Sequence, residues 1–185
     1  MMIYFISDFH FFHDRAFIWK VRGFESEEHM RMTYLSKWKQ TIHKDDDVYV
    51  CGDFCLGQDY DAIKELIGSL PGRIHLIIGN HDTDSKIEFY KTFSNIVEIV
   101  YSTMLNYNGH KYYISHYVTE TATLESNPKY CVINIHGHVH ENRMFTNDVP
   151  YLINVSVDVT GGAFLTFDDI EKAFKDEVQN CIKYL

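Results

Sequence analysis

Short hydrophobic runs alternate with segments of helical periodicity in the first half of the chain. Three apolar runs are typical of buried strands, at residues 2–7, 47–53 and 73–82. Between them, residues 25–43 and 60–70 repeat their apolar positions at helical spacing, and Ser26 is a candidate N-cap for the first helix. The order strand, helix, strand, helix, strand predicts right-handed crossovers and a mainly parallel sheet.

The second half of the chain has a different pattern. Apolar runs within residues 96–117 flank an Asn108-Gly109 turn signal, which predicts a hairpin that ends at His116. Further strands are expected within 130–140 and 151–167, followed by a closing helix over 168–185 with Asp168 as a candidate cap. Neither a repeat nor a Pro-rich or Ser-rich linker interrupts the sequence, so we expect one domain, 1–185.

Composition limits the class of protein. The chain has 185 residues and 45% hydrophobic positions, ordinary for a globular domain with a sizeable core. A net charge of -9 argues against binding to extended nucleic acid. The four cysteines match no zinc or redox spacing, and no segment is long or apolar enough to predict a membrane span or a signal peptide. We therefore expect a cytoplasmic protein, and its oligomeric state stays open.

Polar side chains follow each predicted strand where that strand ends. They are Asp8, His10, Asp53, Asn80, His81, Asp82, His116, His138 and His140. In an open α/β sheet the loops at the carboxyl ends of the strands line one crevice, so these groups are expected to meet. About seven oxygen and nitrogen donors are too many for one zinc ion and suit two metals that share a carboxylate.

The same residues form a series of motifs that resembles a known family. In order, the chain shows "SDFH", "CGDF", "GNHD", "SHYV" and "HGHVH", the signature of the calcineurin-like metallophosphoesterases. The stretches "SDFHFFH" and "INVSVDV" are similar to those of the small, single-domain bacterial and phage-type members, and the resemblance covers nearly the whole chain. It implies a four-layer α/β/β/α sandwich with mixed sheets and a site at the strand carboxyl ends.

The resemblance also implies a role for each motif residue. The metal ligands would be Asp8, His10 and His140 for one ion, Asn80, His116 and His138 for the other, and Asp53 as the bridge between both. His81 would be the general acid that protonates the leaving group, and Asp82 would orient it or tune its charge. His116 lacks the turn that often follows it in the family, and Glu141 stands where a small residue is common; both differences affect the entrance rather than the ligands.

Two further residues are candidates for substrate binding. His13 matches the second histidine of the "SDFHFFH" pattern, where a substrate-side or a supporting role is possible, and Arg22 is a candidate phosphate ligand or a plain surface arginine. Arg143 is a weaker candidate of the same kind, and His136 either supports a ligand or is a buried structural histidine. Selectivity is expected to lie in three loops, at residues 11–25, 54–60 and 117–130.

The expected cofactors are two divalent transition-metal ions. Carboxylate, imidazole and amide ligands without a thiolate suit manganese, iron, nickel, cobalt or zinc, and we favour manganese. Two such ions neutralise the phosphate oxygens and lower the pKa of bound water from about 15.7 toward 7, so that a bridging hydroxide can attack phosphorus. The expected activity is a dinuclear metal-dependent phosphoesterase acting on small phosphodiesters.

Three alternatives remain. The same site can serve a phosphomonoesterase or a nuclease on short ends. A mononuclear metalloprotein with another hydrolytic activity would bind one ion instead of two. The fold can also act as a protein-binding scaffold with a vestigial site, as in a retromer subunit that it resembles, although a complete ligand set would then have no physical reason.

Overall fold

The first of two sheets contains the predicted parallel strands. The computed structural model describes residues 1–120, 132–140 and 143–183. The sheet has the order β4-β3-β2-β1-β9. Its strands are β1 (Ile3–Ile6), β2 (Asp47–Val50), β3 (Arg73–Ile77), β4 (Ile96–Val100) and β9 (Leu165–Thr166). Strands β1 to β4 are parallel, and β9 runs antiparallel to β1.

The second sheet has the order β5-β6-β7-β8. Its strands are β5 (Ser102–Tyr107), β6 (His110–Ser115), β7 (Val132–His136) and β8 (Leu152–Asn154). The hairpin of β5 and β6 turns at Asn108 and Gly109, both at positive φ, as predicted. The first arm of this hairpin is shorter than the apolar pattern implied. Residues 96–100 are β4 of the first sheet, and the chain crosses to the second sheet at Tyr101.

Helices cover the outer face of the first sheet. They are α2 (Glu27–Thr41), α3 (Tyr60–Gly68) and the short α4 (Asp84–Tyr90), preceded by one turn, α1 (Ala16–Trp19). Ser26 caps α2 by accepting a hydrogen bond from the backbone N–H of His29 at 3.0 Å, as expected. Trp38 of α2 is completely buried against Phe9 and Phe54, which follow β1 and β2. This packing holds the loops after β1 and β2 in place.

The long C-terminal helix α6 (Phe167–Lys183) packs into the core between the sheets. Its Phe167 contacts Phe5 of the first sheet and Tyr112 of the second. Asp168, which the sequence predicts as the cap of this helix, does not cap it. Thr166 and Asp169 exchange hydrogen bonds with each other's backbone N–H in a capping box, while Asp168 accepts from the Tyr107 hydroxyl instead.

The predicted strand at 151–167 is also broken up. After the three residues of β8, the chain forms the single turn α5 (Val157–Thr160), and Gly161 ends that turn in the left-handed conformation. Upstream of β8 lies a short 3-10 turn, η2 (Thr146–Asp148). These turns place residues 156–161 next to the ends of β1 and β7 rather than in a sheet.

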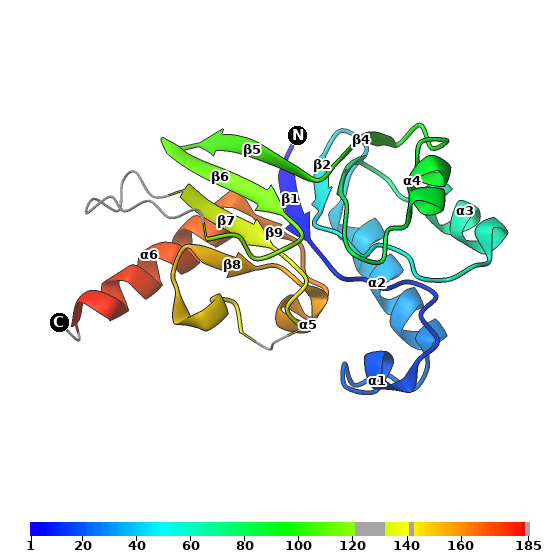
Figure 1. Cartoon of the computed structure of the whole chain (residues 1–185), viewed down its shortest axis with the longest axis horizontal. Coiled ribbons are helices and arrows are strands. Elements are labelled where there is room, and N and C mark those ends of the chain that lie inside the picture. Colours follow the sequence, from blue (N-terminus) through cyan, green and yellow to red (C-terminus); the bar gives the residue numbers. More distant parts are fainter. Residues whose placement is uncertain (121–131, 141–142, 184–185) are drawn as a thin grey trace.

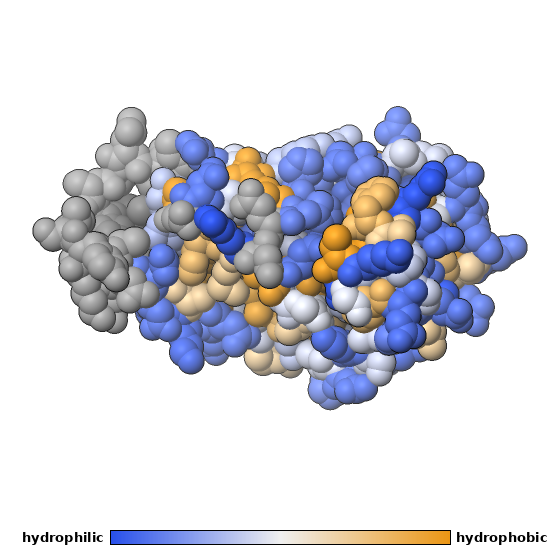
Figure 2. All heavy atoms as spheres, turned by 90° about the horizontal axis from the view of Figure 1, so that it is seen from below, coloured by the Kyte–Doolittle hydropathy of each residue, from blue (hydrophilic) through white to orange (hydrophobic). Residues whose placement is uncertain are grey.

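The expected α/β fold with two mixed sheets is confirmed. Figure 1 shows α2, α3 and α4 at one end of the molecule and α6 beside the second sheet at the other. The carboxyl ends of β1 and β2 meet those of β7 and β6, because His138 N–H donates to the Asp8 carboxylate and His116 Nδ1 lies 2.9 Å from the Cys51 carbonyl. The face in Figure 2 is largely hydrophilic with small apolar patches, and no helix within the described residues is long and apolar enough to cross a membrane.

Candidate metal centre

The loops at the strand ends hold several site residues in a strained backbone conformation. Asp8, His10, Asp53 and His138 all have positive φ, between 51° and 69°. Such angles are uncommon for residues other than glycine and cost roughly 1–3 kcal/mol each, so they persist where the surrounding structure demands them. Here the loops after β1 and β2 are tied together by hydrogen bonds from Asp8 N–H to the Gly52 carbonyl and from His10 N–H to the Asp53 carbonyl.

Two glycines of the motifs allow the site to be this compact. A side chain at Gly79 would collide with the carboxylate of Asp53, and one at Gly137 would collide with Ser7 and the carboxylate of Asp8. The backbones after β3 and β7 therefore lie directly against the two buried aspartates. The glycines in "GNHD" and "HGHVH" are required by this close approach.

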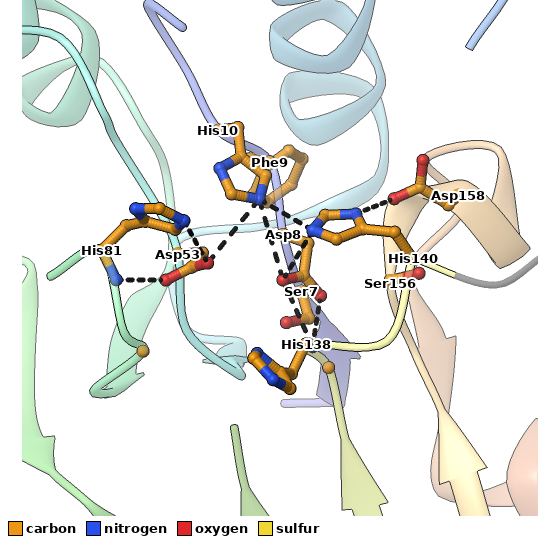
Figure 3. A network of polar contacts seen from close by, with 12 residues as sticks. Ser7, Asp8, Phe9, His10, Asp53, His81, His138, His140, Ser156 and Asp158 are labelled. Carbon is orange, nitrogen blue, oxygen red and sulfur yellow. Dashed lines mark hydrogen bonds and ion pairs between the residues drawn. The ribbon is translucent and has the colours of Figure 1, made fainter. Parts of the chain in front are cut away.

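One group of donor atoms comprises Asp8, His10 and His140. Their ligand atoms lie within 4.8 Å of one another. The Nε2 atoms of His10 and His140 are 3.2 Å apart, and they lie 3.9 Å and 4.0 Å from Asp8 Oδ1. Figure 3 shows the two imidazoles and the Asp8 carboxylate pointing toward one another.

A second group forms around Asp53, Asn80, His116 and His138. Asn80 Oδ1 lies 2.9 Å from His116 Nε2 and 2.9 Å from His138 Nδ1. Asp53 Oδ2 lies 3.7 Å from His116 Nε2 and also 3.7 Å from His10 Nε2 of the first group. Asp8 is likewise within reach of both groups, because Asp8, Asp53 and His116 form a second compact set.

The hydrogen-bonding pattern of the histidines fits cations in both groups. His116 Nδ1 lies 2.9 Å from the Cys51 carbonyl, which only accepts, so Nδ1 carries the hydrogen. In the neutral ring, the lone pair of Nε2 then faces the Asn80 and Asp53 oxygens, which are acceptors too. His140 repeats the arrangement, with Nδ1 2.8 Å from Asp158 and Nε2 facing His10. Imidazoles that bind metals commonly donate their second N–H to a carboxylate or a carbonyl in this way.

The burial of the ionisable groups also favours bound cations at this site. Burial raises the pKa of Asp8 to about 6, although His116 and His140 nearby lower it in part. Burial also lowers the pKa of His10 to about 2, so this imidazole is neutral and its lone pair is available. The hydrogen bond to Asp158 raises the pKa of His140, so the neutral ring beside Asp8 is that of His10. Divalent cations would supply counter-charge to the buried carboxylates at this site.

His81 lies at the open side of this cluster. Its imidazole is 47% exposed, and its Nε2 is 3.9 Å from Asp53 Oδ2. Its backbone N–H donates to Asp53 Oδ1 at 2.9 Å, and its ring lies edge-on to His10. The imidazole is therefore placed where a bound substrate would meet it.

Asp82 does not contact the His81 ring, contrary to our expectation. It is buried, and its Oδ2 accepts hydrogen bonds from the backbone N–H groups of Asp53 and Gly79, both at 2.9 Å. Tyr90 approaches its other oxygen at 3.4 Å. Asp82 thus joins the loops after β2 and β3 and positions the ligands they carry.

Arg22 is also not a free phosphate ligand. Only 3% of its side chain is exposed, and it forms a bidentate pair with Asp158 at 2.8 Å for both bonds. It also donates to the backbone carbonyls of Asp8 and Phe9. Arg22 therefore supports the loop after β1, and it holds Asp158 against His140.

Asp158 is the main residue of the site that sequence reasoning left without a role. Hydrogen bonds from His140 and Arg22 more than offset its burial and lower its pKa well below the usual range, so it stays ionised. The stretch "INVSVDV" contains Asp158, but α5 rather than a strand presents it. The same stretch contributes Asn154, whose side chain donates to the Val139 carbonyl and supports the loop of His138 and His140.

The remaining candidate residues from the sequence are His13, His136 and Arg143. His13 lies beside His10, with ring centroids 5.8 Å apart, and its Nδ1 has no partner among the described residues. His136 is buried, and its ring contacts the Gly137 carbonyl and the Thr146 hydroxyl. Arg143 is exposed. Glu141, Cys131 and most of the loop 117–130 lie outside the described residues.

Comparison with known proteins decides the family. A model of the calcineurin-like phosphoesterase superfamily domain matches residues 1–157. The chain belongs to this superfamily. It is 32% identical over 175 residues to an uncharacterized protein of Methanocaldococcus jannaschii, covering 92% of this chain and 89% of that one. It is 37% identical over 81 residues to the gene 66 protein of Mycobacterium phage L5, covering 43% of this chain and 39% of the phage protein.

A solved structure of the same fold is a protein of unknown function from Aquifex aeolicus. The TM-score is 0.70 at 25% sequence identity, and the match covers 92% of this chain and 98% of that one. The superfamily comprises metal-dependent phosphoesterases, in agreement with the buried aspartate and histidine groups found here. The resemblance read from the motifs is confirmed.

Proposed function

We propose that the protein is a dinuclear metal-dependent phosphoesterase that hydrolyses small phosphodiesters. The observation that supports this proposal is the convergence of oxygen and nitrogen atoms in two adjacent groups, with Asp53 Oδ2 3.7 Å from a histidine nitrogen of each group. Asp8, His10 and His140 would hold one ion, and Asn80, His116 and His138 the other. Asp53 would bridge them. Manganese is our preferred metal, since oxygen and imidazole ligands suit it.

Two divalent cations, when bound, supply positive charge for the phosphate oxygens and activate a water molecule. The protein contributes the remaining parts of the reaction. His81 holds a proton on an exposed imidazole beside the cluster and gives it to the leaving oxygen. Asp82 and Arg22 keep the ligand loops at their spacing through backbone hydrogen bonds.

The engagement of Arg22 favours a diester over a monoester. A phosphomonoester carries about one more negative charge than a diester near neutral pH. Arg22 was the cation that the sequence offered for that charge, yet Asp158 and two backbone carbonyls occupy its guanidinium. Lys86 is similarly buried and donates to the Cys55 and His81 carbonyls. Cys51 and Cys55 are free and buried, which fits action in a reducing, cytoplasmic compartment.

Hydrolysis of model esters tests the proposal. We expect metal-loaded protein to cleave bis-p-nitrophenyl phosphate faster than p-nitrophenyl phosphate and to lose this activity when the metal is chelated. Asp53→Asn removes the bridging charge and is expected to lower kcat/KM by about 10³-fold or more. Asp14→Asn, at an exposed acid of the loop after β1, is the matched control and should retain activity. Faster cleavage of the monoester would move the assignment to a phosphatase.

A further inference from the structure

A cavity opens beside the metal centre, on the side of Asp158. Its volume is about 340 Å³, within the range of small-molecule sites. Its lining comes from the loop after α1, from α2, from α5 and from the loop after β7: Val21, Arg22, Phe24, Tyr34, His140, Val157, Asp158 and Gly161. Four separate segments thus enclose it.

His140 belongs to both the cavity and the metal centre. Its Nε2 faces His10 and Asp8 in the cluster, and its Nδ1 faces Asp158 in the cavity wall. Figure 3 shows the His140 imidazole between His10 and Asp158. The His140 side chain is 39% exposed, so the cluster and the cavity adjoin at this imidazole.

One part of the cavity wall is aromatic and apolar and carries the Tyr34 hydroxyl, while Arg22, His140 and Asp158 form a polar part. The rings of Phe24 and Tyr34 meet edge to face with centroids 5.4 Å apart, next to Val21 and Val157. The Tyr34 hydroxyl makes no hydrogen bond with any residue in the described part of the chain. Burial raises the pKa of Tyr34 to about 12, so this hydroxyl keeps its proton at neutral pH and can donate.

The charged residues of the wall neutralise each other. Arg22 and Asp158 form a bidentate pair, and Asp158 also binds His140. They leave no unpaired charge to hold a second phosphate. The cavity therefore suits a neutral, flat group that stacks against rings and offers a hydrogen-bonding edge.

We propose that this cavity binds the nucleobase of a nucleoside phosphodiester, with the base against Phe24 and its polar edge on the Tyr34 hydroxyl. The inference rests on the proposed phosphodiesterase function and names the substituent that its substrate carries. The net charge of -9 agrees with a single nucleotide unit rather than extended nucleic acid.

Two diesters with the same leaving group test the proposal through the rate of hydrolysis. They are thymidine 5′-(p-nitrophenyl phosphate) and methyl p-nitrophenyl phosphate. We expect wild type to prefer the thymidine ester by about tenfold or more in kcat/KM, and Tyr34→Phe to reduce that preference about three- to tenfold, as loss of one hydrogen bond predicts. Cleavage of the methyl ester, which carries no base, should fall less than cleavage of the thymidine ester in this variant. Tyr117→Phe, which removes a hydroxyl on the His138 side, should leave the preference as it was.

Saturation-transfer NMR with thymidine on metal-free protein tests the cavity without turnover. We expect transfer to the base protons in wild type and its loss in Phe24→Leu, which keeps an apolar side chain but removes the ring. Equal cleavage of the two diesters without saturation transfer would overturn the cavity assignment and leave the phosphodiesterase intact. Transfer to the base with no cleavage of either diester would support the cavity and refute the phosphodiesterase.

Discussion

The two ends of strands β2 and β3 carry polar clusters of similar composition and opposite character. At the amino ends, Asp47 accepts two hydrogen bonds from Arg73, at 2.8 Å and 2.7 Å, and contacts His75 at 3.0 Å. His75 stacks on Tyr49, and its other nitrogen lies 2.9 Å from Glu98. Every donor there faces an acceptor.

At the carboxyl ends, acceptors face one another. The Asn80 and Asp53 oxygens meet Nε2 of His116, whose Nδ1 already donates to the Cys51 carbonyl, and the Nε2 atoms of His10 and His140 lie 3.2 Å apart. The amino-end cluster is complete as protein, whereas the carboxyl-end cluster needs cations. The difference teaches that residue types alone do not distinguish a metal centre from an ion-pair network; the partners of each lone pair do.

Apart from changes to the metal ligands themselves, the largest expected effect at the carboxyl end is that of changing His81. His81→Gln removes the proton donor but leaves the ligands, so we expect kcat to fall about 10²-fold or more with metal content unchanged. The loss should be larger for an alkyl leaving group than for p-nitrophenolate, which departs without a proton. Steady-state kinetics with one ester of each leaving group checks this. An equal loss of kcat on the alkyl ester and on the p-nitrophenyl ester would count against His81 as the acid.

The pair of Asp158 and His140 is expected to matter next. Asp158→Asn keeps the shape but weakens the partner of His140 Nδ1, so we predict a 10- to 100-fold loss of metal affinity. Titration calorimetry with manganese measures it. Unchanged affinity would show that Asp158 acts only through Arg22.

At the amino end the same kind of change should affect stability alone. Hydrogen bonds from Arg73 and His75 outweigh the effect of burial and hold the pKa of Asp47 below its usual range. Asp47→Asn is expected to lower the free energy of unfolding by roughly 1–2 kcal/mol without changing kcat or metal content. Urea denaturation and a kinetic assay together check both parts, and a loss of metal would break the contrast between the two ends.

The smallest effect concerns the pH dependence of stabilisation by metal. Because the pKa of Asp8 is raised to about 6 in the folded protein, its contribution to stability is present below its unfolded pKa and lost as pH rises through 6. Metal binding offsets that loss, so the metal-induced rise in Tm should be greater at pH 7.5 than at pH 5. Thermal denaturation with and without manganese measures it, and a rise that does not depend on pH would contradict the role of Asp8.

Much of the fold could be predicted because its signals are local. Apolar runs revealed β1, β2 and β3, and the Asn108-Gly109 turn revealed the hairpin. The candidate ligands stood out because each follows a strand, and the structure brings all seven into one cluster. The change of sheet between β4 and β5 was not predicted, because the crossing at Tyr101 leaves no break in the apolar pattern.

The supporting residues could not be predicted, because their partners are distant in sequence. Arg22 and Asp158 are 136 positions apart, and only the fold shows that they satisfy each other. Asp82 stands next to His81, which invited a direct role, yet its carboxylate turns to the backbone of the loop after β2. Adjacent residues in a loop point in different directions, and a motif does not record which.

The number of metal ions per chain tests the central claim most directly. We would load wild type, Asp53→Asn and Asp14→Asn with manganese, remove the excess, and determine metal and protein by inductively coupled plasma mass spectrometry and amino-acid analysis. Two ions per chain in wild type and in Asp14→Asn, and fewer than two in Asp53→Asn, are the result predicted by two groups that share Asp53. One ion, or none, in folded wild type would contradict it.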